Sequence, residues 1–210
     1  MRRPAIDFYY EFSSPYSYLA ATRIGALAER AGVHVEWKPF MLGPIFAELG
    51  YSSSPFVDVP LKGNHMWRDV ERLAVHYGLP DFVKPDPFPV NTLLAARVAL
   101  HLNDASRPGF TVAAYKAMFA KGCDLSDRTV VQRVLAGLGH YCDHVMEAAE
   151  LPANKEALKA QTQAARAAGV FGAPSFVAQD GELFWGNDRL EMALAHAVEA
   201  AGLPEASKAS

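Results

Sequence analysis

The chain has 210 residues, half of them hydrophobic and one fifth charged, which suits one globular domain or a domain that carries a large insertion. Its 20 lysines and arginines nearly balance its 23 aspartates and glutamates, so no strong field of one sign favours a nucleic-acid partner or an anionic membrane surface. We therefore expect a small-molecule partner, no nucleic acid and no membrane.

The first 40 residues predict a β-α-β unit. Residues 5–12 (AIDFYYEF) are rich in aromatic and branched side chains, as a buried strand is. Pro15 suits the first position of a helix, which makes Ser14 the natural N-cap, and Gly32 supplies a left-handed stop. A second strand follows at 33–37, and such a crossover predicts two parallel strands.

A helical block follows. Residues 39–62 contain many glycines, prolines and serines and predict a loop around one short turn of helix. From residue 63 onward, Pro and Gly signals separate six helical patterns, at about 65–78, 91–103, 109–121, 127–138, 140–150 and 153–168.

After Gly169 the hydrophobic period changes again. Residues 174–178 and 183–185 predict a hairpin around an Asp-Gly turn. A last helix begins near Asp188, and Glu191 completes a capping-box pattern. The order β-α-β, helices, β-β-α is that of the DsbA-like thioredoxin folds. We therefore expect an α/β protein in which residues 1–40 and 169–203 form a thioredoxin-like domain and residues 41–168 an inserted helical domain.

Two separate segments resemble one family. Residues 8–19 (FYYEFSSPYSYL) resemble the start of 2-hydroxychromene-2-carboxylate isomerases and kappa-class glutathione transferases, whose signature is Ser-Pro-Tyr/Phe-Ser after an aromatic strand. Residues 169–176 (GVFGAPSF) and 184–190 (FWGNDRL) also look like that family. The likeness extends over about residues 5–200.

The resemblance implies that glutathione is the cofactor. Ser14 stands where redox relatives carry the first cysteine, so it would donate a hydrogen bond to the glutathione sulfur while the helix start favours a thiolate. The backbone of Ala173, before a cis Pro174, would pair with the cysteinyl part of glutathione. The other residues implied to bind glutathione are Pro15, Tyr16, Trp185, Gly186, Asn187 and Asp188, the last four at the γ-glutamyl end.

Each of these residues also has a structural interpretation. Ser14 alone reads as an ordinary N-cap, and most X–Pro bonds are trans. Asn187 or Asp188 can simply begin the last helix, a role compatible with ligand binding.

The substrate side rests on fewer residues. Kappa-class enzymes carry an asparagine that helps bind glutathione where this chain has Tyr51, and Ser52 or Ser53 are candidates to replace it. Lys62 and Asn91 are the polar residues expected near the cleft, Lys62 as a cation for a carboxylate or a developing enolate, or else as a solvated surface lysine. Candidates for an aromatic wall, or for core, are Phe40, Met41, Phe46, Tyr51, Phe56, Trp67 and Phe88.

Other chemistry is poorly supported. The two cysteines, Cys123 and Cys142, form no Cys-x-x-Cys pair, so we expect reduced thiols and no disulfide exchange at the helix start. His140 and His144 stand four residues apart without an evident third ligand, and we expect no metal. The N-terminus has no signal-peptide core and no apolar stretch reaches about 18 residues, so we expect a cytoplasmic protein.

The leading function is a glutathione-dependent isomerase, similar to 2-hydroxychromene-2-carboxylate isomerase, that interconverts cis and trans forms of an aromatic α-keto acid through a transient glutathione adduct. A kappa-like glutathione transferase or peroxidase, acting on an electrophile, is the alternative. A third possibility is a non-catalytic thioredoxin-fold module that binds extended peptides beside Pro174. The resemblance also implies a homodimer.

Overall fold

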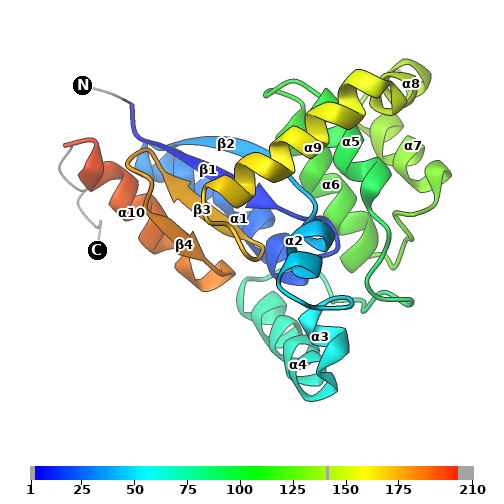
Figure 1. The fold of residues 1–210 in the computed structure, drawn as a ribbon, viewed down its shortest axis with the longest axis horizontal. Coiled ribbons are helices and arrows are strands. Elements are labelled where there is room, and N and C mark those ends of the chain that lie inside the picture. Colours follow the sequence, from blue (N-terminus) through cyan, green and yellow to red (C-terminus); the bar gives the residue numbers. More distant parts are fainter. Residues whose placement is uncertain (1–2, 141, 203–210) are drawn as a thin grey trace.

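The computed structural model describes residues 3–140 and 142–202, and its frame is a mixed four-stranded sheet in the order β2-β1-β3-β4 (Figure 1). Strand β1 (Ala5–Tyr10) pairs in parallel with β2 (His34–Pro39). On its other side β1 pairs antiparallel with β3 (Ser175–Ala178), which pairs antiparallel with β4 (Leu183–Trp185). The parallel crossover and the C-terminal hairpin predicted from the sequence are confirmed. The predicted domain limit at residue 203 lies outside the described residues.

Helix α1 (Pro15–Ala31) joins β1 to β2 and has the predicted ends. The side chain of Ser14 accepts a hydrogen bond from the Ser17 N–H, which satisfies one of the free donors at a helix start. Gly32 has φ 68°, and its N–H bonds back to Ala28 and Glu29. These local signals therefore place the start of α1 directly after the end of β1.

Eight helices separate β2 from β3 along the described chain: α2 (Leu42–Glu48), α3 (Pro55–Asp58), α4 (Pro60–His76), α5 (Leu93–His101), α6 (Arg107–Phe119), α7 (Arg128–Gly137), α8 (Cys142–Glu150) and α9 (Pro152–Ala167). The prediction that residues 39–62 form a loop with one short helical turn is wrong in part, because α2 and α3 are both helical there and α4 begins at Pro60. Ser54 caps α3, and prolines stand at the first positions of α3 and α4.

Two clusters of buried side chains pack against the two faces of the sheet, the smaller one covering only part of its face. Ile6, Phe8 and Tyr10 belong to the larger cluster, with α1, α6 and α10 (Leu190–Ala200). Tyr9 and Val177 point the other way, into a smaller cluster with α2 and the C-terminal end of α9. Figure 1 shows α9 crossing the sheet on the side opposite α1. The alternation of side chains along β1 thus builds both layers.

The capping box expected at Asp188 and Glu191 is wrong. A short 3₁₀ turn (Asn187–Arg189) precedes α10, and neither the turn nor α10 has a side-chain cap. The extra turn moves Asp188 off the cap position. Glu191 instead accepts a bond of 2.6 Å from Arg23 of α1.

Among residues 3–140 and 142–202, no helix is both long and apolar enough to cross a bilayer. The same residues contain no group of three or more histidine, cysteine or acidic side chains arranged to hold a metal ion.

Candidate functional site

The start of α1 meets the turn that leads into β3. The Ser14 hydroxyl donates a hydrogen bond of 3.0 Å to the carbonyl oxygen of Ala173, 159 residues away in the chain. The Ala173–Pro174 peptide bond is cis, as the resemblance implied. Ser14 and Ala173 are both half-buried, whereas Pro15 and Pro174 are buried. The structure therefore brings together the two motifs that carried the resemblance.

The Ser14 hydroxyl has only one proton to donate. It now points to Ala173, while the same oxygen accepts the N–H of Ser17 at 3.2 Å. A ligand atom that took this proton would have to replace the Ala173 carbonyl as acceptor. The helix start beside it carries partial positive charge and favours an anionic acceptor.

Tyr16 ties the start of α1 to the helical insertion. Its hydroxyl donates to Asp69 of α4 at 3.0 Å, and its ring lies 6.4 Å from that of Phe56 in α3. Burial is the main cause that raises the pKa of Tyr16, and the carboxylates of Asp69 and Asp188 raise it further. Tyr16 is therefore a neutral hydrogen-bond donor, and Asp188 lies close enough to influence it.

An exposed aromatic pair borders the Ala173–Pro174 turn. Trp185 is 51% exposed, and its ring centre lies 4.9 Å from that of Phe171. Gly172 makes this approach possible, because a Cβ there would lie 2.4 Å from the indole nitrogen of Trp185. The pair offers apolar surface near Ala173, whose carbonyl oxygen accepts the Ser14 hydrogen bond.

The turn after β4 supplies polar groups. The Gly186 N–H donates to the carbonyl oxygen of Pro174 at 3.0 Å, and Gly186 has φ 111°, which favours glycine. Asn187 is buried and its amide donates to the Tyr77 hydroxyl at 3.2 Å. Its side-chain oxygen has no partner among the described residues. Asp188 is exposed and pairs with Arg189 at 3.2 Å.

The residues proposed for the substrate are less closely connected. Lys62 is exposed in the first turn of α4, and within the described chain no hydrogen bond or ion pair joins it to Ser14 or Ala173. Asn91 is exposed and its side chain accepts the Leu93 N–H at 3.2 Å, at the start of α5. Tyr51 is exposed and packs edge-on against Phe46 at 6.0 Å. Their roles stay predictions.

The aromatic residues suggested as a pocket wall differ in burial. Phe40 is fully buried in the smaller core cluster. Trp67 and Phe88 are half-buried and meet edge-on at 4.7 Å. Ser52, considered as a replacement for the missing asparagine, bonds to Asp58 through both its N–H and its hydroxyl.

Sequence reasoning missed Glu11, which is buried three residues before Ser14. The hydroxyl of Thr92 donates to its carboxyl oxygen at 2.7 Å. Burial raises the pKa of Glu11 to about 7, while the Thr92 and Ser13 hydrogen bonds act in the opposite direction. The available signal was an acidic residue at the end of an apolar, aromatic run, directly before the Ser-Ser-Pro motif.

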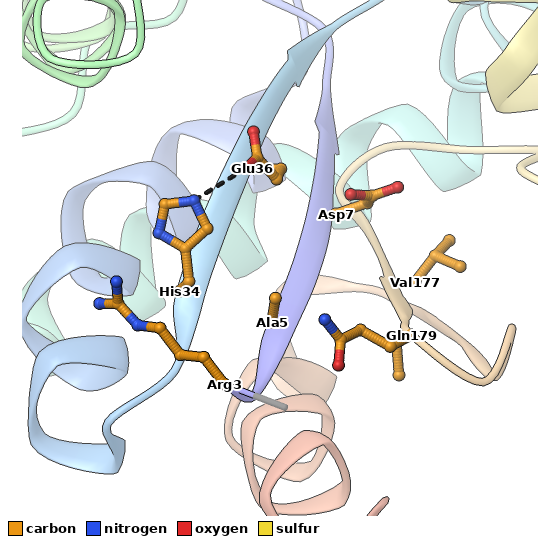
Figure 2. A pocket seen from close by; sticks show the side chains of 8 residues that line it. Arg3, Ala5, Asp7, His34, Glu36, Val177 and Gln179 are labelled. Atoms are coloured by element: carbon orange, nitrogen blue, oxygen red, sulfur yellow. Dashed lines mark hydrogen bonds and ion pairs between the residues drawn. The ribbon is translucent and has the colours of Figure 1, made fainter. Parts of the chain in front are cut away.

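A hollow lies on the part of the sheet that the smaller core cluster leaves uncovered, which we call the open face (Figure 2). It is lined by Arg3, Ala5, Asp7, His34, Glu36, Val177, Ala178 and Gln179. Ala5 pairs with His34 at the beginning of both parallel strands, whereas Ser14 follows the end of β1. The hollow contains none of the predicted site residues. In α/β proteins ligands gather outside the carboxyl ends of strands, which favours the Ser14 end.

The family model described as the DSBA-like thioredoxin domain matches residues 5–198, which include both halves of the sheet and the insertion between them. The chain is also 34% identical over 187 residues to the 2-hydroxychromene-2-carboxylate isomerase of Sphingobium xenophagum, covering 89% of this chain and 94% of that protein. This chain belongs to the DSBA-like thioredoxin family.

Two further relatives are similar over most of the chain. A solved structure of 2-hydroxychromene-2-carboxylate isomerase superposes with a TM-score of 0.82 at 27% identity and covers 94% of each chain. Glutathione S-transferase kappa 1 of Homo sapiens is 26% identical, over 91% of this chain and 89% of that protein. Two of the three relatives are thus isomerases by name and the third is a glutathione enzyme.

Proposed function

We propose that this chain is a glutathione-dependent isomerase that interconverts cis and trans forms of a conjugated aromatic α-keto acid. The observation that carries the proposal is the contact between Ser14, at the start of α1, and Ala173, before the cis Pro174. A hydroxyl at a helix start can stabilise a thiolate without being oxidised itself. The similarity to the isomerase of Sphingobium xenophagum supports the reaction.

The polar groups at the site fit a ligand such as glutathione. The buried side-chain oxygen of Asn187 lacks a partner among the described residues, and buried polar atoms normally have one. Asp188 is exposed next to it and offers a carboxylate to an ammonium group. Together with Ser14 these groups provide one contact for a sulfur and two for the γ-glutamyl end.

The residues of the chain would act by binding and orientation. When bound, glutathione supplies a thiolate that adds reversibly to a conjugated carbon and so allows rotation about a former double bond. Ser14 turns its proton from Ala173 to the sulfur, and the start of α1 stabilises the negative charge. The Phe171–Trp185 pair supplies apolar surface for an aromatic substrate.

The test is titration calorimetry with reduced glutathione, combined with thiolate absorbance, on wild type and Ser14→Ala. We expect saturable binding with a thiolate signal in wild type and a signal at least about tenfold weaker in Ser14→Ala. Asp127→Ala is the matched control, because Asp127 caps α7 as Ser14 caps α1. Both substitutions remove a helix cap, but the control keeps the thiolate signal.

Assays with 2-hydroxychromene-2-carboxylate and with electrophiles then separate the two enzyme functions. Isomerisation that requires glutathione and Ser14 supports the proposal. Formation of a stable glutathione conjugate without isomerisation favours a kappa-type transferase, to which the similarity with the human kappa enzyme also points. Absence of glutathione binding contradicts both.

A further inference from the structure

Glu11 is a buried carboxyl group without a cation. Glu11 is only 7% exposed, and its carboxyl group accepts a hydrogen bond of 2.7 Å from the Thr92 hydroxyl. Lysine, arginine and histidine side chains form eleven ion pairs in the described chain, and none of these includes Glu11. Burying such a group without a charged partner is unfavourable, so its place calls for a role other than stability.

The backbone of Glu11 is part of the framework that holds Ser14. Its carbonyl oxygen accepts the Ser14 N–H at 3.0 Å and the Tyr115 hydroxyl at 2.8 Å. The neighbouring Ser13 hydroxyl accepts the Val90 N–H at 3.0 Å. Glu11 and Ser14 therefore belong to one hydrogen-bonded turn, which the Thr92 and Val90 contacts fasten to the segment before α5.

The titratable groups packed around this turn are tyrosines. Burial and the charge of Glu11 both raise the pKa of Tyr115 in α6. Tyr10 of β1 and Tyr18 of α1 pack against Tyr115, with ring centres 6.3 and 6.2 Å from its own. Burial raises the pKa of all three, so they stay neutral. Arg107 is the nearby cation that acts on Tyr10, and its guanidinium bonds to backbone carbonyls of Trp37 and Leu102. Glu11, with a pKa of about 7, is the group that changes charge.

We propose that Glu11 is a positioning residue whose protonation is coupled to the ionisation of a thiol held at Ser14. This inference rests on the proposed glutathione site. An ionised Glu11 opposes the positive end of α1 and disfavours the thiolate, whereas a protonated Glu11 leaves the helix start unopposed. By reciprocity the thiolate favours protonation of Glu11. The thiol gives the proton of its S–H bond to solvent, and Glu11 takes up a proton from solvent to form an O–H bond.

The first experiment measures the pKa of glutathione bound to the whole protein, by thiolate absorbance between about pH 5 and about pH 9. In Glu11→Gln the Thr92 hydroxyl keeps an acceptor oxygen but the charge is gone. We expect Glu11→Gln to lower the pKa of the bound thiol by about 1, because removing a buried negative charge near the helix start favours the thiolate. Glu36→Gln, on the open face of the sheet, is the matched control and leaves that pKa unchanged. Equal values in wild type and Glu11→Gln overturn the proposal.

A second experiment needs no ligand. Carbon-13 NMR of glutamate carboxyl groups identifies Glu11 by its absence in Glu11→Gln, and nitrogen-15 NMR follows the Ser14 amide. We expect Glu11 to titrate near pH 7 and the Ser14 amide to follow with the same midpoint. Thr92→Val removes the hydrogen bond that lowers the pKa of Glu11, so the midpoint rises.

A Ser14 amide that does not follow Glu11, or a Glu11 that titrates at an ordinary pH, overturns the coupling. If wild type fails to bind glutathione, the proposed function is contradicted, whereas the two NMR titrations still decide whether Glu11 and Ser14 are coupled.

Discussion

Two carboxyl groups of the same segment, Asp7 and Glu11, have opposite surroundings. Asp7 lies in β1 on the open face of the sheet (Figure 2). Lys38 of β2 donates a hydrogen bond of 2.6 Å to its carboxylate. Glu11 follows the other end of β1, is buried, and has only hydroxyl and backbone donors. Four residues along one chain therefore separate a solvated ion pair from a buried acid that loses its proton near neutral pH.

The difference shows that position, and not residue type, decides what each carboxyl group does. On the open face a charge keeps much of its hydration and a partner adds little. Under the start of α1 the same charge is desolvated, and its effect on neighbouring groups is large. The predictions below test this contrast, starting with the buried end.

The largest effect is expected from the pH dependence of stability in Glu11→Gln. The pKa of Glu11 rises from an ordinary 4.5 to about 7 on folding, so the folded state holds its proton more tightly. Wild type therefore loses stability as the pH rises from about 4.5 to about 7, by roughly 3 kcal/mol at about 1.4 kcal/mol per pKa unit. Glutamine has no proton to lose and avoids this loss.

Denaturant unfolding of both proteins at low and at mildly alkaline pH measures the effect. The advantage of Glu11→Gln over wild type should be about 3 kcal/mol greater at the higher pH. Other groups titrate alike in the two proteins and cancel in the difference. A pH-independent difference would show that Glu11 is not buried as an acid.

Gly172→Ala is expected to have the next largest effect. The new Cβ would overlap the Trp185 indole ring, so the ring or the turn must shift and the packing against Phe171 changes. We expect a loss of about 1 kcal/mol, a changed tryptophan fluorescence and weaker glutathione binding. Gly25→Ala in α1 is the control, because no atom lies within 4 Å of its Cβ. In a helix that change stabilises by about 0.5–1 kcal/mol, so thermal melting should separate the two in sign.

The β-α-β unit could be predicted from the sequence because the local signals at both ends of α1 agree. Pro15 at the first helical position, Ser14 before it and Gly32 after it fix α1 almost without tertiary information. The failure at Asp188 has the opposite origin. The capping pattern was present in the sequence. However, the Gly186 N–H bonds to the Pro174 carbonyl and a short 3₁₀ turn follows, while the Glu191 carboxylate forms an ion pair with Arg23.

The candidate site was predictable in part for a similar reason. Motifs marked Ser14 and Ala173, and the structure joins them by one hydrogen bond. Tyr77 and Asp69 escaped notice because their contacts with Asn187 and Tyr16 span 110 and 53 residues and leave no local pattern. Glu11 lay within the motif itself, but only the packing of Thr92 and Tyr115 shows that it is buried.

The smallest effect is expected on the open face, in Asp7→Asn. Burial alone would lower the pKa of Lys38, but the hydrogen bond and charge of Asp7 hold it above its ordinary value. Both side chains stay about one third exposed, so removing the pair should cost only about 0.2–1 kcal/mol. The loss should shrink when salt is raised to about 1 M, because exposed charges are then screened. Denaturant unfolding at low and high salt measures it. A salt-independent loss as large as that predicted for Glu11 would mean that the two ends of β1 do not differ in solvation, and that the contrast drawn from their surroundings is wrong.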